Sequence, residues 1–315
     1  MKYKYSIIAP IYNEIDNLQE LIRRLTEVMD TTDEKWELVL VDDGSTDGST
    51  GQIRKLALEH DFVHPVIFAR NFGHQIAVTA GLDYAQGEAV VIIDADLQDP
   101  PELILDMIDK WKEGYQVVYA VRTEREGESW FKKTTAALFY RVIFKITDVD
   151  IPLDTGDFRL LDRKIVDVMG TMRERHRFLR GMAAWVGYRQ IGVPYKRSAR
   201  YAGETKYPLN KMIKLALTAI TSFSYFPLQL ATYVGFVCAG ISILSIPVVI
   251  ILRAVSEQVF LGQASTLIAV LFLGGVQLIC LGILGEYIGR IYDEAKGRPL
   301  YIVNDQDLHK GKDHK

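Results

Sequence analysis

Three oxygen-bearing side chains follow a short apolar run near the middle of the soluble-looking part of the chain. Residues 90–93 are branched and apolar, as in a strand buried on both faces of a parallel sheet. Asp94, Asp96 and Gln98 come next at alternate positions. In an extended chain, alternate side chains point the same way, and three hard oxygen ligands suit Mg²⁺ or Mn²⁺ holding a nucleotide's phosphates. The alternative is a solvated acidic turn ended by Asp99 and Pro100.

The elements that position these side chains are predicted from apolar periodicity. Strand-like runs and helix-like runs alternate through the first 120 residues. This alternation predicts an α/β fold with a mostly parallel sheet and helices on both faces. Predicted strands lie at residues 6–11, 37–41, 66–68, 90–93 and 117–120, and predicted helices at 18–28, 53–57 and 76–84.

Polar clusters follow four of the predicted strands, at residues 10–14, 42–48, 70–75 and 94–99. Ligands of such sheets bind beyond the carboxyl ends of the strands, so we expect the four clusters to form one site. His74 lies in the third cluster, where a lone histidine is more often structural than catalytic. Arg122 is either a further phosphate contact or an ordinary surface arginine.

The second half of the chain contains two stretches without Asp, Glu, Lys or Arg, at residues 215–252 and 258–285. Each exceeds the ~20 residues that span a bilayer. We therefore expect two transmembrane helices, at residues 228–252 and 264–286. Gly274, Gly275, Gly282 and Gly285 would allow close helix contacts, which makes a homo-oligomer plausible.

The distribution of positive charge predicts the orientation of this hairpin. Lys211 and Lys214 precede the first span, basic residues from Arg290 onward follow the second, and the intervening loop has only Arg253. The positive-inside rule places both termini in the cytoplasm.

The predicted organisation is a soluble domain followed by a membrane hairpin. Residues 130–146 predict an amphipathic helix at a membrane surface, or alternatively an ordinary core-packed helix. The net charge of −3 argues against a general nucleic-acid binder. The expected units are residues 1–210, an interfacial helix at 211–227, the two spans within 228–290, and a cytoplasmic tail at 291–315.

Three motifs together resemble those of inverting family 2 glycosyltransferases with a GT-A fold. They are Pro10-Ile11-Tyr12-Asn13-Glu14, Val41-Asp42-Asp43-Gly44-Ser45-Thr46-Asp47 and Asp94-Ala95-Asp96-Leu97-Gln98-Asp99-Pro100. Within that family the chain is most similar to polyisoprenyl-phosphate glycosyltransferases, a group that includes bacterial bactoprenol glucosyltransferases and dolichyl-phosphate mannose synthases. The resemblance covers nearly the whole chain, including both predicted spans.

The resemblance implies a nucleotide-sugar site with a divalent metal. Asp42 would accept N–H groups from the base; alternatively, it belongs to a turn in which Ser45 or Asp47 caps a helix. Asp96, which the resemblance makes catalytic, would hold Mg²⁺ or Mn²⁺ with Asp94 and Gln98, and the metal would neutralise the leaving diphosphate. The implied nucleotide-sugar residues are Pro10, Asn13, Glu14, Asp42, Asp43, Arg70, Asp94 and Ala95.

The resemblance also implies an acceptor site built from two stretches. Asp157 corresponds to the catalytic carboxylate, usually assigned as general base; alternatively, it lies in a β-turn after Gly156. A phosphate monoester has a second pKa of ~6, so the acceptor is already anionic, and we expect Asp157 mainly to orient it. A basic loop at 200–207 would bind the lipid phosphate, or alternatively anionic headgroups in general. Its implied binding residues are Arg200, Gly203, Thr205 and Lys206, with Thr205 where the family commonly has Ser.

The expected reaction transfers one glucose from UDP-glucose to undecaprenyl phosphate at the cytoplasmic membrane face, with inversion. GDP-mannose or another UDP-sugar is the alternative donor. A processive polysaccharide synthase is disfavoured, because the chain lacks a Gln-x-x-Arg-Trp motif. A catalytically silent membrane adaptor is also disfavoured, because it would not need these motifs together.

Overall fold

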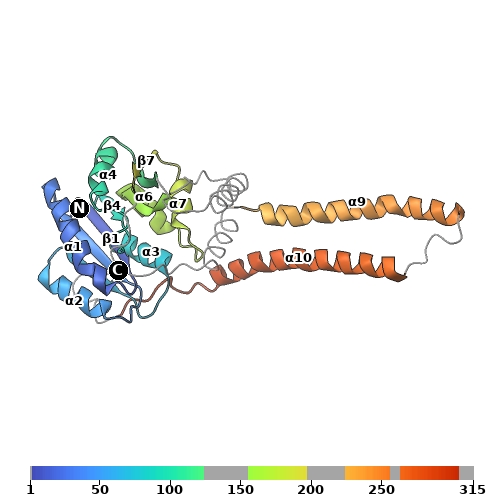
Figure 1. The fold of residues 1–315 in the computed structure, drawn as a ribbon, viewed down its shortest axis with the longest axis horizontal. Helices are drawn as coiled ribbons and strands as arrows, with labels where there is room; N and C mark the ends of the chain where they lie inside the picture. Colours follow the sequence, from blue (N-terminus) through green and yellow to red (C-terminus); the bar gives the residue numbers. More distant parts are fainter. Residues whose placement is uncertain (1, 124–154, 197–223, 256–262, 305–315) are drawn as a thin grey trace.

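The computed structural model describes residues 2–123, 155–196, 224–255 and 263–304 (Figure 1). The predicted surface helix at 130–146 and the predicted lipid-phosphate loop at 200–207 lie outside the described residues. So does most of the predicted interfacial helix at 211–227.

A seven-stranded sheet with the order β3-β2-β1-β4-β6-β5-β7 forms the centre of the catalytic domain. β1, β2, β3 and β4 run parallel to one another, whereas β6 is antiparallel to both neighbours. The expectation of a mostly parallel sheet is confirmed. The strands are β1 (Tyr5–Ile11), β2 (Trp36–Asp42), β3 (Val63–Ile67), β4 (Ala89–Ile92), β5 (Val117–Arg122), β6 (Thr155–Asp162) and β7 (Gln190–Tyr195).

Helices cover both faces of the sheet because each carries an apolar stripe. In α1, buried leucines and other apolar side chains recur at helical spacing. Together with α2 and α4, α1 packs on one face, and α3, α6 and α7 pack on the other. The helices of this domain are α1 (Ile15–Met29), α2 (Ser49–Glu59), α3 (His74–Tyr84), α4 (Leu103–Lys112), α6 (Arg163–Thr171) and α7 (Leu179–Trp185), with a 3₁₀ turn η1 (Asp30–Thr32) after α1.

A close approach of α3 to the sheet depends on one glycine. A Cβ added at Gly81 would lie 2.2 Å from Cγ2 of Ile8 in β1. Only a residue without a side chain allows this separation, so Gly81 lets α3 pack closely on β1.

Two long helices, α9 (Phe226–Val255) and α10 (Gln263–Ala295), extend side by side away from the catalytic domain (Figure 1). Both contain a segment long and apolar enough to cross a membrane, Phe226–Val248 and Ile268–Ala295. Tyr287 Oη donates a 2.8 Å hydrogen bond to the carbonyl of Ser224, which ties the bases of the helices together. The structure thus contains the predicted hairpin, with α10 continuing past residue 286.

The glycines of α10 do not mediate its contact with α9. A Cβ added at Gly274, Gly275, Gly282 or Gly285 would meet nothing within 4 Å. The expected oligomer through these positions stays a prediction.

Residues after α10 return to the sheet, where Val303 forms an antiparallel bridge with Phe68 beyond the end of β3. The tail expected at 291–315 therefore includes a segment attached to the catalytic domain.

Candidate active site

Four polar segments meet at one edge of the sheet, as predicted. Parallel register aligns Ile11 of β1 with Asp42 of β2 and Asp42 with Ile67 of β3. β4 ends beside β1, where the Ile93 N–H donates to the carbonyl of Ile8 at 3.0 Å. The loops after these four strands therefore emerge together.

The loops after β1 and β2 are linked by hydrogen bonds between them. Asn13 has a left-handed backbone (φ 55°), and its Oδ1 accepts the Thr46 N–H at 2.8 Å, while its own N–H donates to Ser45 Oγ at 3.0 Å. The Glu14 N–H donates to Ser49 Oγ at 3.2 Å. These bonds tie together the two loops at the predicted nucleotide site, and Pro10 is buried in β1.

Asp42 and Asp43 are both buried and serve as internal hydrogen-bond acceptors. Asp42 accepts the Ser45 N–H at 2.9 Å and the Thr50 hydroxyl. Asp42 is fully buried, so contact with a base would require the surrounding loops to open, and that assignment stays a prediction. Asp43 accepts the N–H groups of Phe72 at 2.6 Å and Gly73 at 2.9 Å. Burial raises the pKa of Asp43, and these two bonds oppose the rise.

Asp47, rather than Ser45, accepts N–H groups at the starts of two helices, although the N-cap position of α2 itself is Gly48. Its Oδ1 accepts the Ser49 N–H at 2.9 Å, and its Oδ2 accepts the Ile15 N–H at 3.2 Å. Since Ile15 begins α1 and Ser49 begins α2, one carboxylate holds the starts of both helices.

Gly44 allows the loop after β2 to touch the loop after β3. Its φ is +71°, and an added Cβ would lie 2.7 Å from backbone atoms of Arg70 and Asn71. Arg70 is exposed there, with its guanidinium 4.3 Å from the ring centroid of Phe72.

The Asp94–Gln98 segment has a different backbone from the one predicted. β4 ends at Ile92, and Leu97 adopts a left-handed conformation (φ 56°), so the prediction that the chain stays extended from the strand through Gln98 is wrong. The Gln98 N–H donates to Asp96 Oδ1 at 3.2 Å across this turn. Nevertheless Asp94, Asp96 and Gln98 are half-buried and alternate with the buried Ala95, Leu97 and Asp99, so the three predicted ligands share the accessible side.

Asp157 lies in β6, not in a turn, and three side chains donate to its carboxylate. Nε2 of His74 lies 3.1 Å from Oδ2 and Nε2 of Gln75 lies 3.1 Å from the same oxygen. Arg180 Nε donates to Oδ1 at 2.7 Å. His74 is also 3.8 Å from Asp94 Oδ1, which joins the predicted metal site to the predicted acceptor site.

The pKa values of Asp157, His74 and Asp94 are shifted in different directions by their surroundings. Burial alone would raise the pKa of Asp157, but the charge of Arg180 and the bond from His74 outweigh it and hold the pKa well below its ordinary value. Burial would lower the pKa of His74, yet the bond to Asp157 and the charge of Asp94 raise it to about 9. Burial raises the pKa of Asp94 to about 6. Asp157 is thus a fixed anion and His74 a cation near neutral pH.

Arg122 and Tyr195 line the neighbouring part of the edge. Arg122 Nε donates to Tyr195 Oη at 3.2 Å, and the Tyr195 hydroxyl donates to Asp99. Burial and the Asp99 charge raise the pKa of Tyr195 to about 12. The Arg122 guanidinium packs against Gly156, where an added Cβ would lie 2.8 Å from its Nη2.

The donor set fits a divalent metal that is completed by its substrate. Asp94 is desolvated, with the cationic His74 beside it and the carboxylates of Asp157, Asp99 and Asp96 nearby; carboxylate oxygens are the hard ligands that a divalent cation prefers. Within the described residues no three His, Cys, Asp or Glu side chains form a ready-made metal site. Mg²⁺ commonly uses one or two carboxylates with substrate phosphates, so Asp94 and Asp96 suffice on the protein side.

The sequence indicated most of this site but not the groups that hold Asp157. His74 was expected to be structural, and neither Gln75 nor Arg180 was assigned a role. For His74 and Gln75 the available signal was their place directly after a strand-end loop. Arg180 carries no local signal, because only the docking of α7 brings it to β6.

Comparison with known protein families shows to which family this chain belongs. Residues 6–170, more than half of the chain, match Glycosyl transferase family 2. The chain belongs to this family. It is a glycosyltransferase, and its seven-stranded sheet is the expected GT-A type of fold. Residues 226–291 match a second family, the GtrB C-terminal hairpin.

Relatives cover nearly the whole chain. Glycosyltransferase YkcC of Bacillus subtilis is 55% identical, over 95% of this chain and 93% of its own length. The bactoprenol glucosyl transferase of Shigella phage SfV is 42% identical, over 96% of this chain and 99% of its own length. Among solved structures, a mannosyltransferase from Pyrobaculum calidifontis covers 91% of this chain and 88% of its own, with 20% identity and a TM-score of 0.46. That likeness is too distant to bear on donor or metal.

Proposed function

We propose that this glycosyltransferase transfers one glucose from UDP-glucose to undecaprenyl phosphate at the cytoplasmic face of the membrane, with inversion at the anomeric carbon. The observation that carries the proposal is the similarity to a bactoprenol glucosyl transferase over 96% of this chain, hairpin included. A soluble glycosyltransferase would have no use for two candidate membrane spans.

The donor would bind at the edge formed by the loops after β1, β2, β3 and β4. In this proposal the linked loops around Asn13 and Ser45 shape the nucleotide pocket, and Asp94 and Asp96, with Gln98, would hold Mg²⁺ or Mn²⁺ against the diphosphate. When bound, the metal would neutralise the charge that develops on the leaving nucleoside diphosphate. Arg70 is an exposed cation on the same edge and would face the diphosphate.

The acceptor oxygen needs no proton removed. The phosphate monoester has a second pKa of ~6, so a P–O⁻ oxygen forms the new bond to the anomeric carbon while the bond to the diphosphate oxygen breaks. Asp157 is held anionic by His74, Gln75 and Arg180, and its pKa is far below that of an effective base at neutral pH. Its proposed role is to keep these donors, two of them cationic, in place around the acceptor and the sugar.

The lipid would reach this site from the membrane around α9 and α10. The predicted phosphate-binding residues Arg200, Gly203, Thr205 and Lys206 precede α9 in the chain, which suits a headgroup that stays close to the bilayer. The proposed orientation has both termini in the cytoplasm, where nucleotide sugars are made.

A transfer assay with a panel of donors tests the proposal. Detergent-purified protein is incubated with undecaprenyl phosphate, Mg²⁺ and labelled UDP-glucose, GDP-mannose or UDP-N-acetylglucosamine, and the lipid is extracted. We expect label in the lipid from UDP-glucose, lost with EDTA and in Asp96→Ala. Label from GDP-mannose alone would overturn the donor but keep the reaction. If no donor gave label in the lipid and the protein bound no nucleotide in the presence of Mg²⁺, the result would instead support a catalytically silent membrane adaptor.

A further inference from the structure

The segment after α10 is fastened to the end of β3. We call this segment, residues 296–304, the strap. The carbonyl of Ile302 accepts the Ala69 N–H at 2.9 Å, and the Asn304 N–H donates to the carbonyl of Ile67 at 2.8 Å. The Tyr301 ring stacks on Phe68, with centroids 5.2 Å apart. The strap thereby extends the sheet edge beyond β3.

Tyr301 is anchored at its hydroxyl as well. It donates to Asp83 Oδ2 at 2.8 Å, and Arg173 donates to Asp83 Oδ1 at 2.9 Å. Asp83 lies near the end of α3, so the strap holds both the strand before the loop at 68–73 and the helix after it.

That loop leads directly into the candidate active site. The rings of Phe68 and Phe72 contact edge to face, with centroids 5.5 Å apart. The N–H groups of Phe72 and Gly73 donate to Asp43, and the next residue is His74, which contacts Asp157. Any shift of Phe68 would therefore move the start of α3 and the His74 side chain.

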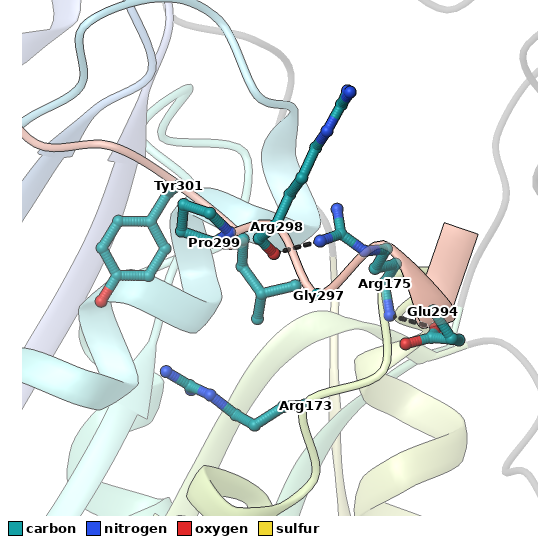
Figure 2. A pocket seen from close by; sticks show the side chains of 8 residues that line it. Arg173, Arg175, Glu294, Gly297, Arg298, Pro299 and Tyr301 are labelled. Carbon is teal, nitrogen blue, oxygen red and sulfur yellow. Dashed lines mark hydrogen bonds between the residues drawn. The ribbon is translucent and has the colours of Figure 1, made fainter. Parts of the chain in front are cut away.

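The base of α10 is fastened to a second segment, the one before α7. Glu294 Oε1 accepts the Arg175 N–H at 2.6 Å, and the Arg175 guanidinium donates to the carbonyl of Arg298 (Figure 2). His176 Nε2 lies 3.5 Å from Asp293 Oδ2. An open pocket of about 300 Å³ lies beside these bonds, lined by Arg173, Arg175, Glu294 and residues 297–301 (Figure 2).

This second segment leads to the other side of Asp157. The Leu179 N–H, at the start of α7, donates to Gln75 Oε1 at 3.0 Å. Arg180 follows and donates to Asp157 Oδ1. The end of α10 and the strap thus hold the two segments, at 67–75 and 175–180, that contain His74, Gln75 and Arg180, the partners of Asp157 within the described part of the chain.

We propose that the strap and the base of α10 are a positioning device that holds the Asp157 site together from the second membrane helix. Tyr301 and Glu294 are its positioning residues, since they touch neither Asp157 nor the predicted metal ligands. The consequence for sugar transfer rests on the proposed function, whereas the consequence for the order of the site does not.

Matched substitutions in the full-length protein release the strap selectively. Asn304→Pro removes the N–H that bonds Ile67, and Asn304→Ala keeps it. Tyr301→Ala removes both the ring stack and the bond to Asp83, whereas Tyr301→Phe removes only the bond. Glu294→Ala removes the acceptor for the Arg175 N–H, and Glu294→Gln keeps one.

Amide hydrogen exchange provides a readout that does not depend on catalysis. We expect the amides of Phe72, Gly73 and Leu179 to exchange about tenfold faster in Asn304→Pro and Tyr301→Ala, with the Leu179 amide also faster in Glu294→Ala. Amides within α4 should keep their rate, which separates release of the strap from global unfolding. Asn304→Ala and Glu294→Gln should match the parent protein.

Sugar transfer is measured on the same variants. We expect kcat to fall about tenfold in Asn304→Pro and Tyr301→Ala, in proportion to the exchange rates. Unchanged exchange at Phe72, Gly73 and Leu179 would overturn the inference. If both variants fail to fold, Tyr301→Phe decides: faster exchange at the same amides supports the inference, and no change overturns it. A parent protein without transfer activity would refute the proposed function, and the exchange data would still decide the strap's role.

Discussion

At the scale of single residues, Asp157 is the group whose surroundings most restrict its chemistry. A general base needs an accessible lone pair and a pKa near the working pH. Asp157 instead has both oxygens engaged by His74, Gln75 and Arg180, and its pKa is held well below the ordinary value. An anion of this kind organises cations and is a poor proton acceptor.

Asp157→Asn should therefore lose activity by an amount that does not shrink as pH rises above the acceptor's second pKa. We expect kcat to fall by about 10²–10³ over the pH range in which His74 of the parent enzyme stays charged, below its pKa of about 9. Asp167→Asn, at an exposed position on α6, is the control and should leave kcat unchanged. A loss that shrinks as pH rises above the acceptor's second pKa would instead identify Asp157 as a base.

Asp94 gives a prediction about stability in the absence of metal. Its pKa is about 6 in the folded protein and ~3.9 when unfolded. Because folding raises the pKa of Asp94, its contribution to the stability of the folded protein is fully present below the unfolded-state pKa. That contribution is lost as pH rises through the folded-state pKa. In EDTA, Asp94→Asn should therefore raise the melting temperature by about 2–5 °C at pH 8 and by much less at pH 4.

Thermal unfolding of the two proteins at both pH values checks this. A lower melting temperature for Asp94→Asn at pH 8 would contradict this prediction. It would show that the attraction between Asp94 and His74 stabilises the protein by more than burial of the Asp94 charge destabilises it. The same shift predicts that Mg²⁺ affinity falls as pH drops through about 6, because protons and metal compete for the carboxylate.

At the scale of elements, the sequence predicted strands β1 to β5 and missed β6 and β7. β1, β2 and β4 each contain an apolar run, at residues 7–11, 38–41 and 89–92, and such runs identify buried parallel strands. β6 contains Gly156, Asp157 and Arg159, which give no strand signal, and it pairs with β4 and β5 across a long stretch of chain. The turn at Leu97 was missed because a left-handed leucine is rare.

The packing of α3 on β1 predicts an unusual response to a helix-favouring substitution. Gly81→Ala would place a Cβ 2.2 Å from Cγ2 of the buried Ile8. The cost of overpacking, about 1–3 kcal/mol, exceeds the gain of about 0.5–1 kcal/mol from replacing glycine in a helix. We expect Gly81→Ala to lower the melting temperature, measured by thermal unfolding in detergent.

Gly170 in α6 is the matched control, because an added Cβ there meets nothing within 4 Å. Gly170→Ala should be neutral or slightly stabilising. Equal effects of the two substitutions would contradict the packing argument.

At the scale of the whole molecule, the division into a catalytic domain and an apolar hairpin was evident from charge alone. The attachment of the strap to β3 was not, because pairing between residues near 68 and near 303 has no local sequence signal. The similarity of the hairpin to a named C-terminal family supports its role as an anchor.

The two apolar helices predict how the protein can be extracted from membranes. Large apolar side chains along both helices are exposed, for example Phe236, Leu244, Leu271 and Leu278. Burying them in lipid stabilises the protein far more than surface charge could. The full-length protein should therefore remain with membranes after washes in high salt and alkaline carbonate, and detergent should release it. Release by salt alone would contradict a spanning hairpin.

In the proposed reaction, the enzyme transfers sugar to a lipid phosphate at one face of the membrane only. The most direct measurement supplies labelled UDP-glucose only outside proteoliposomes that contain the full-length protein, undecaprenyl phosphate and Mg²⁺, and then counts label in the extracted lipid. We predict label in the lipid, dependent on undecaprenyl phosphate, lost in Asp96→Ala, and abolished when external protease removes the outward-facing catalytic domains. Label that stays entirely in water-soluble products, with donor consumed, would contradict this proposal.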